Sequence, residues 1–229
     1  MLYVSILGDS ISTYTNYNPQ GYSVYYDGNM QSLNGMTSVY DTWWAKVNQA
    51  LHAYLCVNNS YSGSKVAGTG FPAASSPQRT GALHTTTARP QIILIYIGFN
   101  DFGNGINIRK DHPNNMFDND GPYFEDCYRK MLSDIKRNYP DAKILCATLM
   151  RTCIKEQPDW HFPEYFAGIP YKAYNEAIRN VCRQEGCFLA DLEALNMRYE
   201  TLDGTHPTAQ GHVTLYHGWV HWLATAGLL

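Results

Sequence analysis

The stretch YVSILGDSI, at residues 3–11, begins as a short apolar run and ends in a polar turn. A run of this length that stops at glycine is typical of a buried strand. Ser10 follows at once, so its hydroxyl is expected at the carboxyl end of that strand. In open α/β sheets, ligands bind in the crevice outside the carboxyl ends of the strands. The stretch therefore predicts an α/β protein with Ser10 at the functional edge of its sheet.

Further apolar runs along the chain predict the rest of this sheet, and helical patterns lie between them. Such alternation indicates parallel strands with helices on both faces. No repeat, low-complexity tract or linker interrupts the pattern, so we expect one domain over residues 1–229. The expected strands are 3–7, 54–57, 92–97, 142–148 and 188–190, and the expected helices are 41–51 (with Asp41 as the N-cap), 123–139, 170–181 and 208–224.

Three segments, 13–40, 102–121 and 151–169, are too long for ordinary connections. Each follows the end of a strand, so all three are expected on the active face, as lids or binding walls. The first is dense in tyrosine, and the third carries Trp160 and Phe162. Aromatic rings stack on sugar faces, which indicates a glycan site. The alternative is that each ring packs into a small core under its own loop.

A second polar motif, DGTH at residues 203–206, stands near the C-terminus. A serine hydroxyl is a poor nucleophile until a base takes its proton, and a histidine oriented by a carboxylate does this well. Imidazole ordinarily titrates near pH 6.5, which suits it to move protons at neutral pH. Ser10, Asp203 and His206 also occur in the chain order used by α/β hydrolases. The alternative is a turn that only starts the last helix, and one turn can serve both purposes.

Two more motifs follow predicted strands: SGS at residues 62–64 and GFND at residues 98–101. With these, the sequence resembles the SGNH hydrolases, the GDSL-like esterase and lipase superfamily. The four marker residues of that family correspond to Ser10, Gly63, Asn100 and His206, and Asp203 corresponds to the acid of its Asp-x-x-His motif. The resemblance covers nearly the whole chain. It departs from the best-known signature at Ile11, where that signature has leucine, a mild change at a packing position.

The resemblance implies a three-layer α/β/α sandwich with a parallel, flavodoxin-like sheet of about five strands. It also implies ester hydrolysis through an acyl-enzyme, with Ser10, Asp203 and His206 as catalytic residues. The oxyanion hole would comprise the N–H groups of Ser10 and Gly63 and the side-chain amide of Asn100. Family members cleave short acyl esters, sugar acetates, lysophospholipids and thioesters. The aromatic loops favour an O-acetyl carbohydrate esterase; the alternatives are a lysophospholipase or thioesterase, and a non-catalytic glycan-binding protein.

The resemblance implies a small-molecule or glycan ester as the substrate, and composition points to no further partner. The net charge of −3 favours neither nucleic acid nor an anionic membrane, and no apolar stretch approaches the ~20 residues that span a bilayer. The first strand lacks a preceding basic region, so we interpret it as core and not as a signal peptide. A cytoplasmic location is expected on this ground, although a trimmed signal would leave the same sequence. Oligomeric state has no signature in the sequence.

No cofactor or metal is expected. The sequence lacks the glycine pattern of a dinucleotide loop and the lysine of a P-loop. His217 and His221 have the spacing of a helical zinc pair, but no H-E-x-x-H motif accompanies them. The six cysteines include no C-x-x-C pair, so we expect free thiols, with a Cys182–Cys187 disulfide left open.

Overall fold

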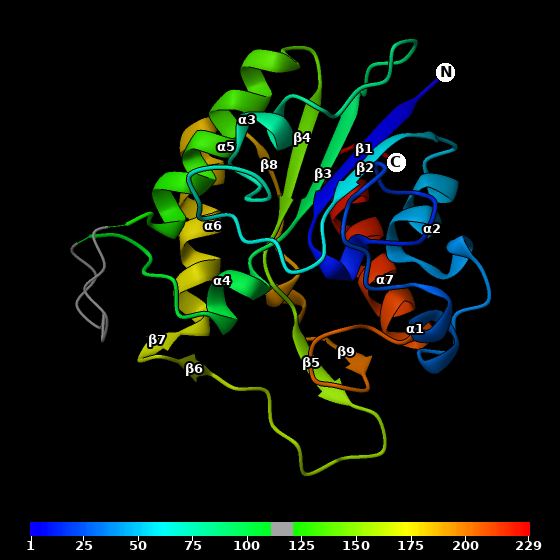
Figure 1. The fold of residues 1–229 in the computed structure, drawn as a ribbon, viewed down its shortest axis with the longest axis vertical. Helices are drawn as coiled ribbons and strands as arrows, with labels where there is room; N and C mark the ends of the chain where they lie inside the picture. The colour runs from blue at the N-terminus through cyan, green and yellow to red at the C-terminus, as the bar shows by residue number, and fades with distance from the viewer. Residues whose placement is uncertain (111–120) are drawn as a thin grey trace.

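A five-stranded parallel sheet forms the centre of the computed structural model, which describes residues 1–110 and 121–229 (Figure 1). Its strand order is β2-β1-β3-β4-β8, the doubly wound order of flavodoxin-like sheets. The α/β fold and all the strands predicted from the sequence are confirmed, with ends shifted by a few residues. The strands are β1 (Tyr3–Gly8), β2 (Tyr54–Ser60), β3 (Ile92–Tyr96), β4 (Lys143–Ala147) and β8 (Phe188–Ala190).

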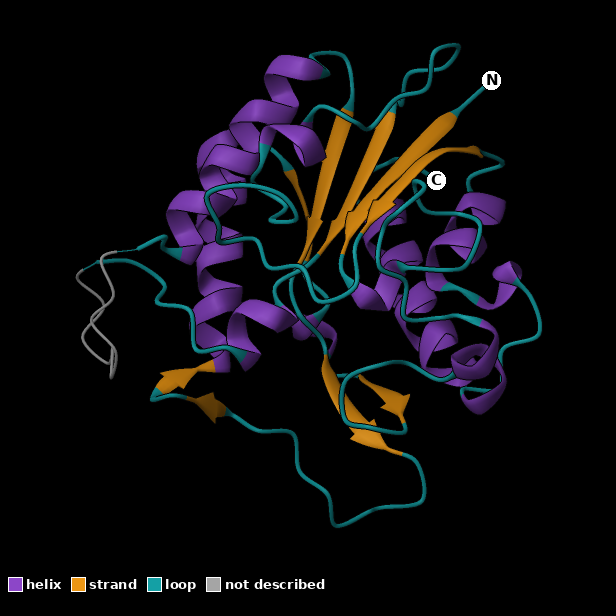
Figure 2. Ribbon diagram, in the orientation of Figure 1, coloured by secondary structure: helices purple, strands orange, loops and turns teal. Residues whose placement is uncertain are grey.

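Helices cover both faces of the sheet and complete three layers (Figure 2). On one face α2 packs against α7, and on the other α5 packs against α6 and α3. The helices are α1 (Gly28–Leu33), α2 (Trp43–Ala50), α3 (Pro77–Thr80), α4 (Phe99–Gly103), α5 (Phe124–Asn138), α6 (Tyr171–Glu185) and α7 (Ala209–Thr225). None of the helices in the described part of the chain is long and apolar enough to cross a membrane.

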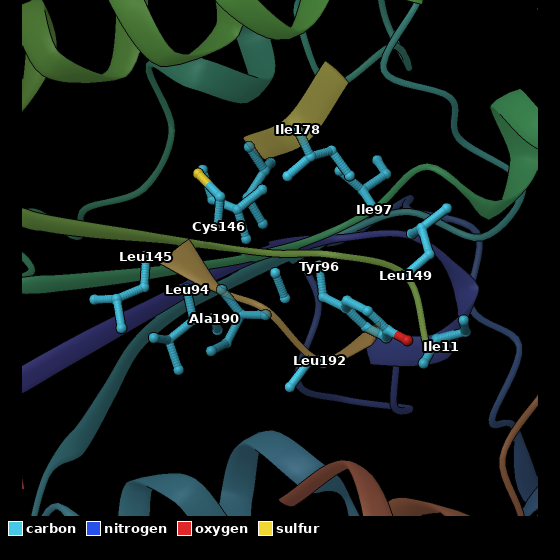
Figure 3. Close-up of a cluster of buried hydrophobic side chains, with 14 of the residues drawn as sticks. Ile11, Leu94, Tyr96, Ile97, Leu145, Cys146, Leu149, Ile178, Ala190 and Leu192 are labelled. Atoms are coloured by element: carbon cyan, nitrogen blue, oxygen red, sulfur yellow. The ribbon is translucent and has the colours of Figure 1, made fainter. Parts of the chain in front are cut away.

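The core lies on both faces of the central strands, as expected for a parallel sheet. Every residue of β3 is buried, so this strand is a continuous apolar run without alternation. Figure 3 shows Leu94 and Tyr96 on one face of the sheet and Ile97 and Cys146 on the other. Both faces of the sheet are therefore buried. The polar groups that could take part in a reaction lie at the ends of the strands.

Two boundaries of the predicted helices differ from the prediction by more than one residue. Helix α2 starts two residues later than expected, because Thr42 and not Asp41 is its cap: Thr42 Oγ1 accepts the N–H of Ala45. Asp41 instead closes the preceding turn through the N–H groups of Thr37 and Ser38. Helix α6 continues past the predicted end until Gly186, whose φ of 66° terminates it.

Two of the long segments contain structure that the sequence pattern did not predict. The first includes α1, and the third includes β5 (Arg151–Ile154), which pairs in parallel with β9 (Arg198–Thr201). A second small pair joins β6 (Tyr165–Phe166) to β7 (Ile169–Pro170). Of the remaining segment, 102–121, residues 111–120 lie outside the described residues. Figure 1 shows β5 and β9 beyond the carboxyl ends of the main strands.

All six cysteines are free. The predicted free thiols are confirmed, and the open alternative of a Cys182–Cys187 disulfide is wrong. The two residues interact through a backbone hydrogen bond, in which the N–H of Cys187 donates to the Cys182 carbonyl at 2.9 Å.

Candidate active site

Ser10, Gly63 and Asn100 follow three adjacent strands at the same edge of the sheet. The pairing register places Gly8 of β1 beside Ser60 of β2 and Tyr96 of β3. The segments that follow these residues therefore start at one level and converge. Ser10 is the first residue of a 3₁₀ turn, Ser10–Ser12, and is itself buried.

The structure brings Ser10 and His206 together, although they are 196 positions apart in the chain. Ser10 Oγ lies 2.9 Å from His206 Nε2, and His206 Nδ1 lies 2.7 Å from Asp203 Oδ2. An ionised carboxylate can only accept, so the proton of a neutral imidazole belongs on Nδ1. Nε2 is then an acceptor facing the Ser10 hydroxyl, which is the arrangement that a general base requires.

The turn that carries Asp203 and His206 is rigid. Asp203 Oδ1 accepts the backbone N–H groups of Thr205 at 2.9 Å and His206 at 2.8 Å. Burial alone would raise the pKa of Asp203, but the hydrogen bonds from His206 and from these N–H groups hold that pKa well below its usual range. The carboxylate is therefore charged at neutral pH.

Residues of the small β5–β9 pair hold this turn in place through hydrogen bonds. Thr152 of β5 donates its hydroxyl proton to the Gly204 carbonyl at 2.8 Å. Thr201 of β9 accepts the Gly204 N–H at 3.0 Å, and Tyr199 donates to the Thr205 carbonyl at 2.9 Å. These contacts explain why a chain segment far from the sheet edge still positions an imidazole against β1.

Gly63 and Asn100 are joined through Ser64. Asn100 Nδ2 donates to the Ser64 carbonyl at 3.0 Å, which leaves the second amide N–H for another acceptor. Gly63 has a φ of 79°, a conformation that side-chain-bearing residues rarely adopt, and a Cβ there would meet nothing within 4 Å. The space beside the Gly63 Cα is therefore open, and no side chain of residue 63 would obstruct a substrate that approaches there.

Two buried carboxyl groups near the site have structural partners. Asp9 accepts the Ile11 N–H at 3.0 Å and so shapes the turn of Ser10; burial raises its pKa to about 6. Asp101 accepts the N–H groups of Val66 and Ala67, and burial raises its pKa to about 7. Asp101 therefore holds the loop after Gly63 in place, which fits the structural role that its position after a strand suggests.

The sequence did not predict several residues of the site. Thr13 Oγ1 donates to the Ser10 carbonyl at 2.8 Å, and the Tyr25 ring stacks on His206. Arg79 is fully buried and donates to the Gly8 carbonyl at 2.8 Å. The tyrosine density of segment 13–40 was the only signal in the sequence, and it does not distinguish Tyr25 from its neighbours.

The described residues contain no group of three or more histidine, cysteine, aspartate or glutamate side chains that could hold a metal ion. His212, six residues after His206, is fully buried, and its Nδ1 accepts the Trp43 N–H at 3.2 Å. Burial lowers the pKa of His212 to about 3, so this ring is neutral.

Comparison with solved structures finds the same fold in other proteins. The chain is similar to a protein from Bacteroides ovatus provisionally classed as a GDSL-like lipase, at 23% identity and a TM-score of 0.74, over 98% of this chain and 99% of that one. A protein of the same provisional class from Bacteroides uniformis is 26% identical, with a TM-score of 0.71, over 98% and 96%.

A more distant likeness is to an active-site mutant of a family two carbohydrate esterase from Clostridium thermocellum. It has 17% identity and a TM-score of 0.58, over all of this chain and 65% of that one. No curated protein matches the sequence.

The family comparison gives a direct assignment. The model of the GDSL-like lipase/acylhydrolase family matches residues 2–159, more than half of the chain. That range contains Ser10, Gly63 and Asn100, whereas Asp203 and His206 lie beyond it. The strand order, the three-layer architecture and this match agree, and the chain belongs to the GDSL-like lipase/acylhydrolase (SGNH hydrolase) family.

Proposed function

We propose that the protein is a serine esterase that hydrolyses short-chain acyl esters through an acyl-enzyme. The observation that supports this most is the continuous hydrogen-bonded path from Ser10 through His206 to Asp203, with distances of 2.9 and 2.7 Å. A nucleophile, a base and an orienting group in hydrogen-bond contact are the signature of covalent acyl transfer.

Acylation follows from this geometry. Ser10 Oγ attacks the ester carbonyl carbon while His206 Nε2 takes the hydroxyl proton, and the carbonyl oxygen becomes an oxyanion. The N–H groups of Ser10 and Gly63 and the free amide N–H of Asn100 bind that oxyanion. When the tetrahedral adduct collapses, the alcohol leaves with the proton from His206, and Ser10 carries the acyl group.

Deacylation repeats the steps with water. The water oxygen attacks the acyl carbon while His206 Nε2 takes a proton from that water. The same donors hold the second oxyanion. Collapse breaks the bond to Ser10 Oγ, which recovers its proton from His206, and the acid is released. Asp203 stays ionised throughout and stabilises the imidazolium that forms twice in the cycle.

For the substrate, we propose an O-acetyl carbohydrate. Rings of Tyr22, Tyr61 and Phe71 meet edge to face, with centroids 5.2–5.4 Å apart, and Phe71 is 45% exposed. The cluster adjoins the oxyanion side of the site, because the Tyr61 N–H donates to the Gly8 carbonyl. A pocket of about 340 Å³ opens next to it at Gly63. The distant likeness in fold to a family two carbohydrate esterase also supports this choice.

Turnover of p-nitrophenyl acetate and labelling by a fluorophosphonate test the reaction. Ser10→Ala should lower kcat by about 10³-fold or more and abolish labelling. Ser12→Ala is the matched control, because Ser12 Oγ accepts from the Trp43 indole and does not face His206; this variant should keep the label. Ser10→Ala with near-wild-type activity would exclude the mechanism, and a wild type that neither turns over nor reacts would favour the non-catalytic glycan-binding alternative.

An acyl-chain series and an acetylated xylan fragment test the substrate. We expect acetyl esters to be preferred over octanoyl esters. Phe71→Ala should lower kcat/KM for the acetylated fragment roughly fivefold, about 1 kcal/mol of ring stacking, and leave p-nitrophenyl acetate unchanged. Tyr54→Ala, which removes a 57% exposed ring at the opposite end of the sheet, should change neither. Preference for long chains would support the lysophospholipase or thioesterase alternative.

A further inference from the structure

Tyr25 covers one face of His206. The two rings are parallel, with an interplanar angle of 7° and centroids 3.5 Å apart. The Tyr25 hydroxyl reaches past the imidazole and donates to Asp203 Oδ2 at 3.2 Å. This is the same oxygen that lies 2.7 Å from His206 Nδ1. One side chain therefore contacts both members of the proposed base–acid pair.

Tyr25 is held in this position by the turns that it joins. Its N–H donates to Thr13 Oγ1 at 2.9 Å, and that hydroxyl donates to the Ser10 carbonyl at 2.8 Å. The next residue, Tyr26, is fully buried and donates to the Pro207 carbonyl at 2.7 Å. The Tyr26 ring also meets the Tyr25 ring edge to face, at 4.9 Å and 87°. The pair thus ties the turn of Ser10 to the turn of His206.

We propose that Tyr25 is a positioning residue for the proposed esterase reaction, acting through Asp203 and His206. Its ring confines the imidazole to the plane in which Nε2 faces Ser10. The electron-rich face of the ring also stabilises the imidazolium that forms in each transition state. Its hydroxyl shares Asp203 Oδ2 with His206 and so weakens the pull of the carboxylate on the imidazole proton.

Among the residues that the structure describes, few charged or titratable groups lie around the His206 imidazole. Asp203 and Tyr25 contact it directly, and the buried Asp9 and His212 act on it from farther away. Burial raises the pKa of the Tyr25 phenol to about 12, and the nearby Asp203 carboxylate adds to this effect. The phenol therefore remains a donor over the whole range in which an esterase is assayed.

Two variants separate the ring from the hydroxyl. Tyr25→Phe keeps the stacked ring, so kcat should stay within about threefold of wild type. Without the shared hydrogen bond, Asp203 acts more strongly on the imidazole. The acidic limb of kcat/KM should then move to higher pH. Tyr25→Leu removes the ring, and kcat should fall roughly 5- to 30-fold with KM within about twofold. Tyr40→Leu, a 59% exposed tyrosine in the same segment, is the control and should behave as wild type.

The outcomes distinguish this inference from the esterase proposal on which it rests. A wild type that is active and dependent on Ser10, with both Tyr25 variants unchanged in kcat and pH profile, overturns the role of Tyr25 alone. A wild type with no Ser10-dependent turnover overturns both. Recovery of kcat in the Phe variant relative to the Leu variant, with a displaced acidic limb, supports the inference and is not expected from loss of folding.

Discussion

At the scale of single residues, the site depends on donors that are oriented before any substrate arrives. The Asn100 amide is fixed by its bond to the Ser64 carbonyl, and the imidazole of His206 is fixed by Asp203 on its edge and Tyr25 on its face. Preorganised dipoles stabilise charge that develops in a transition state without further reorganisation. Such groups should affect kcat far more than KM.

Asn100→Ala tests this directly. We expect kcat for p-nitrophenyl acetate to fall roughly 10²- to 10³-fold with little change in KM, the effect of losing one oxyanion donor. Asn104→Ala is a suitable control, because Asn104 lies one helical turn away, is exposed, and its side-chain amide donates to the Asn100 carbonyl and not to Ser64. A large rise in KM with kcat intact would show that Asn100 holds substrate in the ground state.

At the scale of elements, segments that are remote in the sequence hold the strand ends in register. The β5–β9 pair supports the turn of His206, and Arg79 of α3 supports the turn of Ser10. Arg79 is fully buried and donates to the carbonyls of Gly8, Asn59 and Pro72 and to the Asn59 side chain. Burial lowers its pKa to about 10, so it keeps its charge at neutral pH.

Replacing Arg79 by methionine should therefore reduce the free energy of unfolding by about 3 kcal/mol, because several buried carbonyl groups lose their donor. Urea denaturation followed by tryptophan fluorescence measures this change. Arg89→Met is the control: Arg89 donates to the Asn138 carbonyl in an exposed contact, and its loss should cost less than about 1 kcal/mol. An equally small effect at Arg79 would show that water replaces its hydrogen bonds.

At the scale of the whole molecule, burial sets opposing pH dependences. His212 at the start of α7 is buried and neutral, with its pKa lowered to about 3, whereas the pKa of Asp9 is raised to about 6. Below about pH 6.5, His212 binds a proton in the unfolded chain but stays neutral in the native state. His212 therefore destabilises the fold increasingly as pH falls below 6.5. Asp9 acts the other way, because the native state retains a proton up to about pH 6 that the unfolded chain releases near 3.8.

The contribution of His212 can be isolated as a difference. When the pH falls from 6.5 to 5.0, the free energy of unfolding of wild type should decrease by roughly 2 kcal/mol more than that of His212→Asn. The reason is that the variant has no histidine at this position to take up a proton on unfolding. Urea denaturation at both pH values measures it, with the exposed His221→Asn as control. A difference that does not change with pH would mean that His212 is protonated in the native state.

The sequence by itself determined the sheet and the outline of the site. Short apolar runs were each followed by a polar motif, and parallel strands bring such ends to one edge. This placed Ser10, Gly63 and Asn100 after three successive predicted strands without any knowledge of packing. The motif at residues 203–206 also predicted its own local geometry, since Asp203 bonds within its own turn.

Only the tertiary structure decided what surrounds those residues. The Tyr25–Asp203 contact spans 178 positions, and Thr152 meets Gly204 across 52. Neither segment has a periodicity that marks it, because irregular loops are shaped by the surfaces on which they pack. The cap at Thr42, the β5–β9 pair and the burial of Arg79 escaped prediction for the same reason. Each depends on contacts between distant segments, and local sequence patterns carry no record of those contacts.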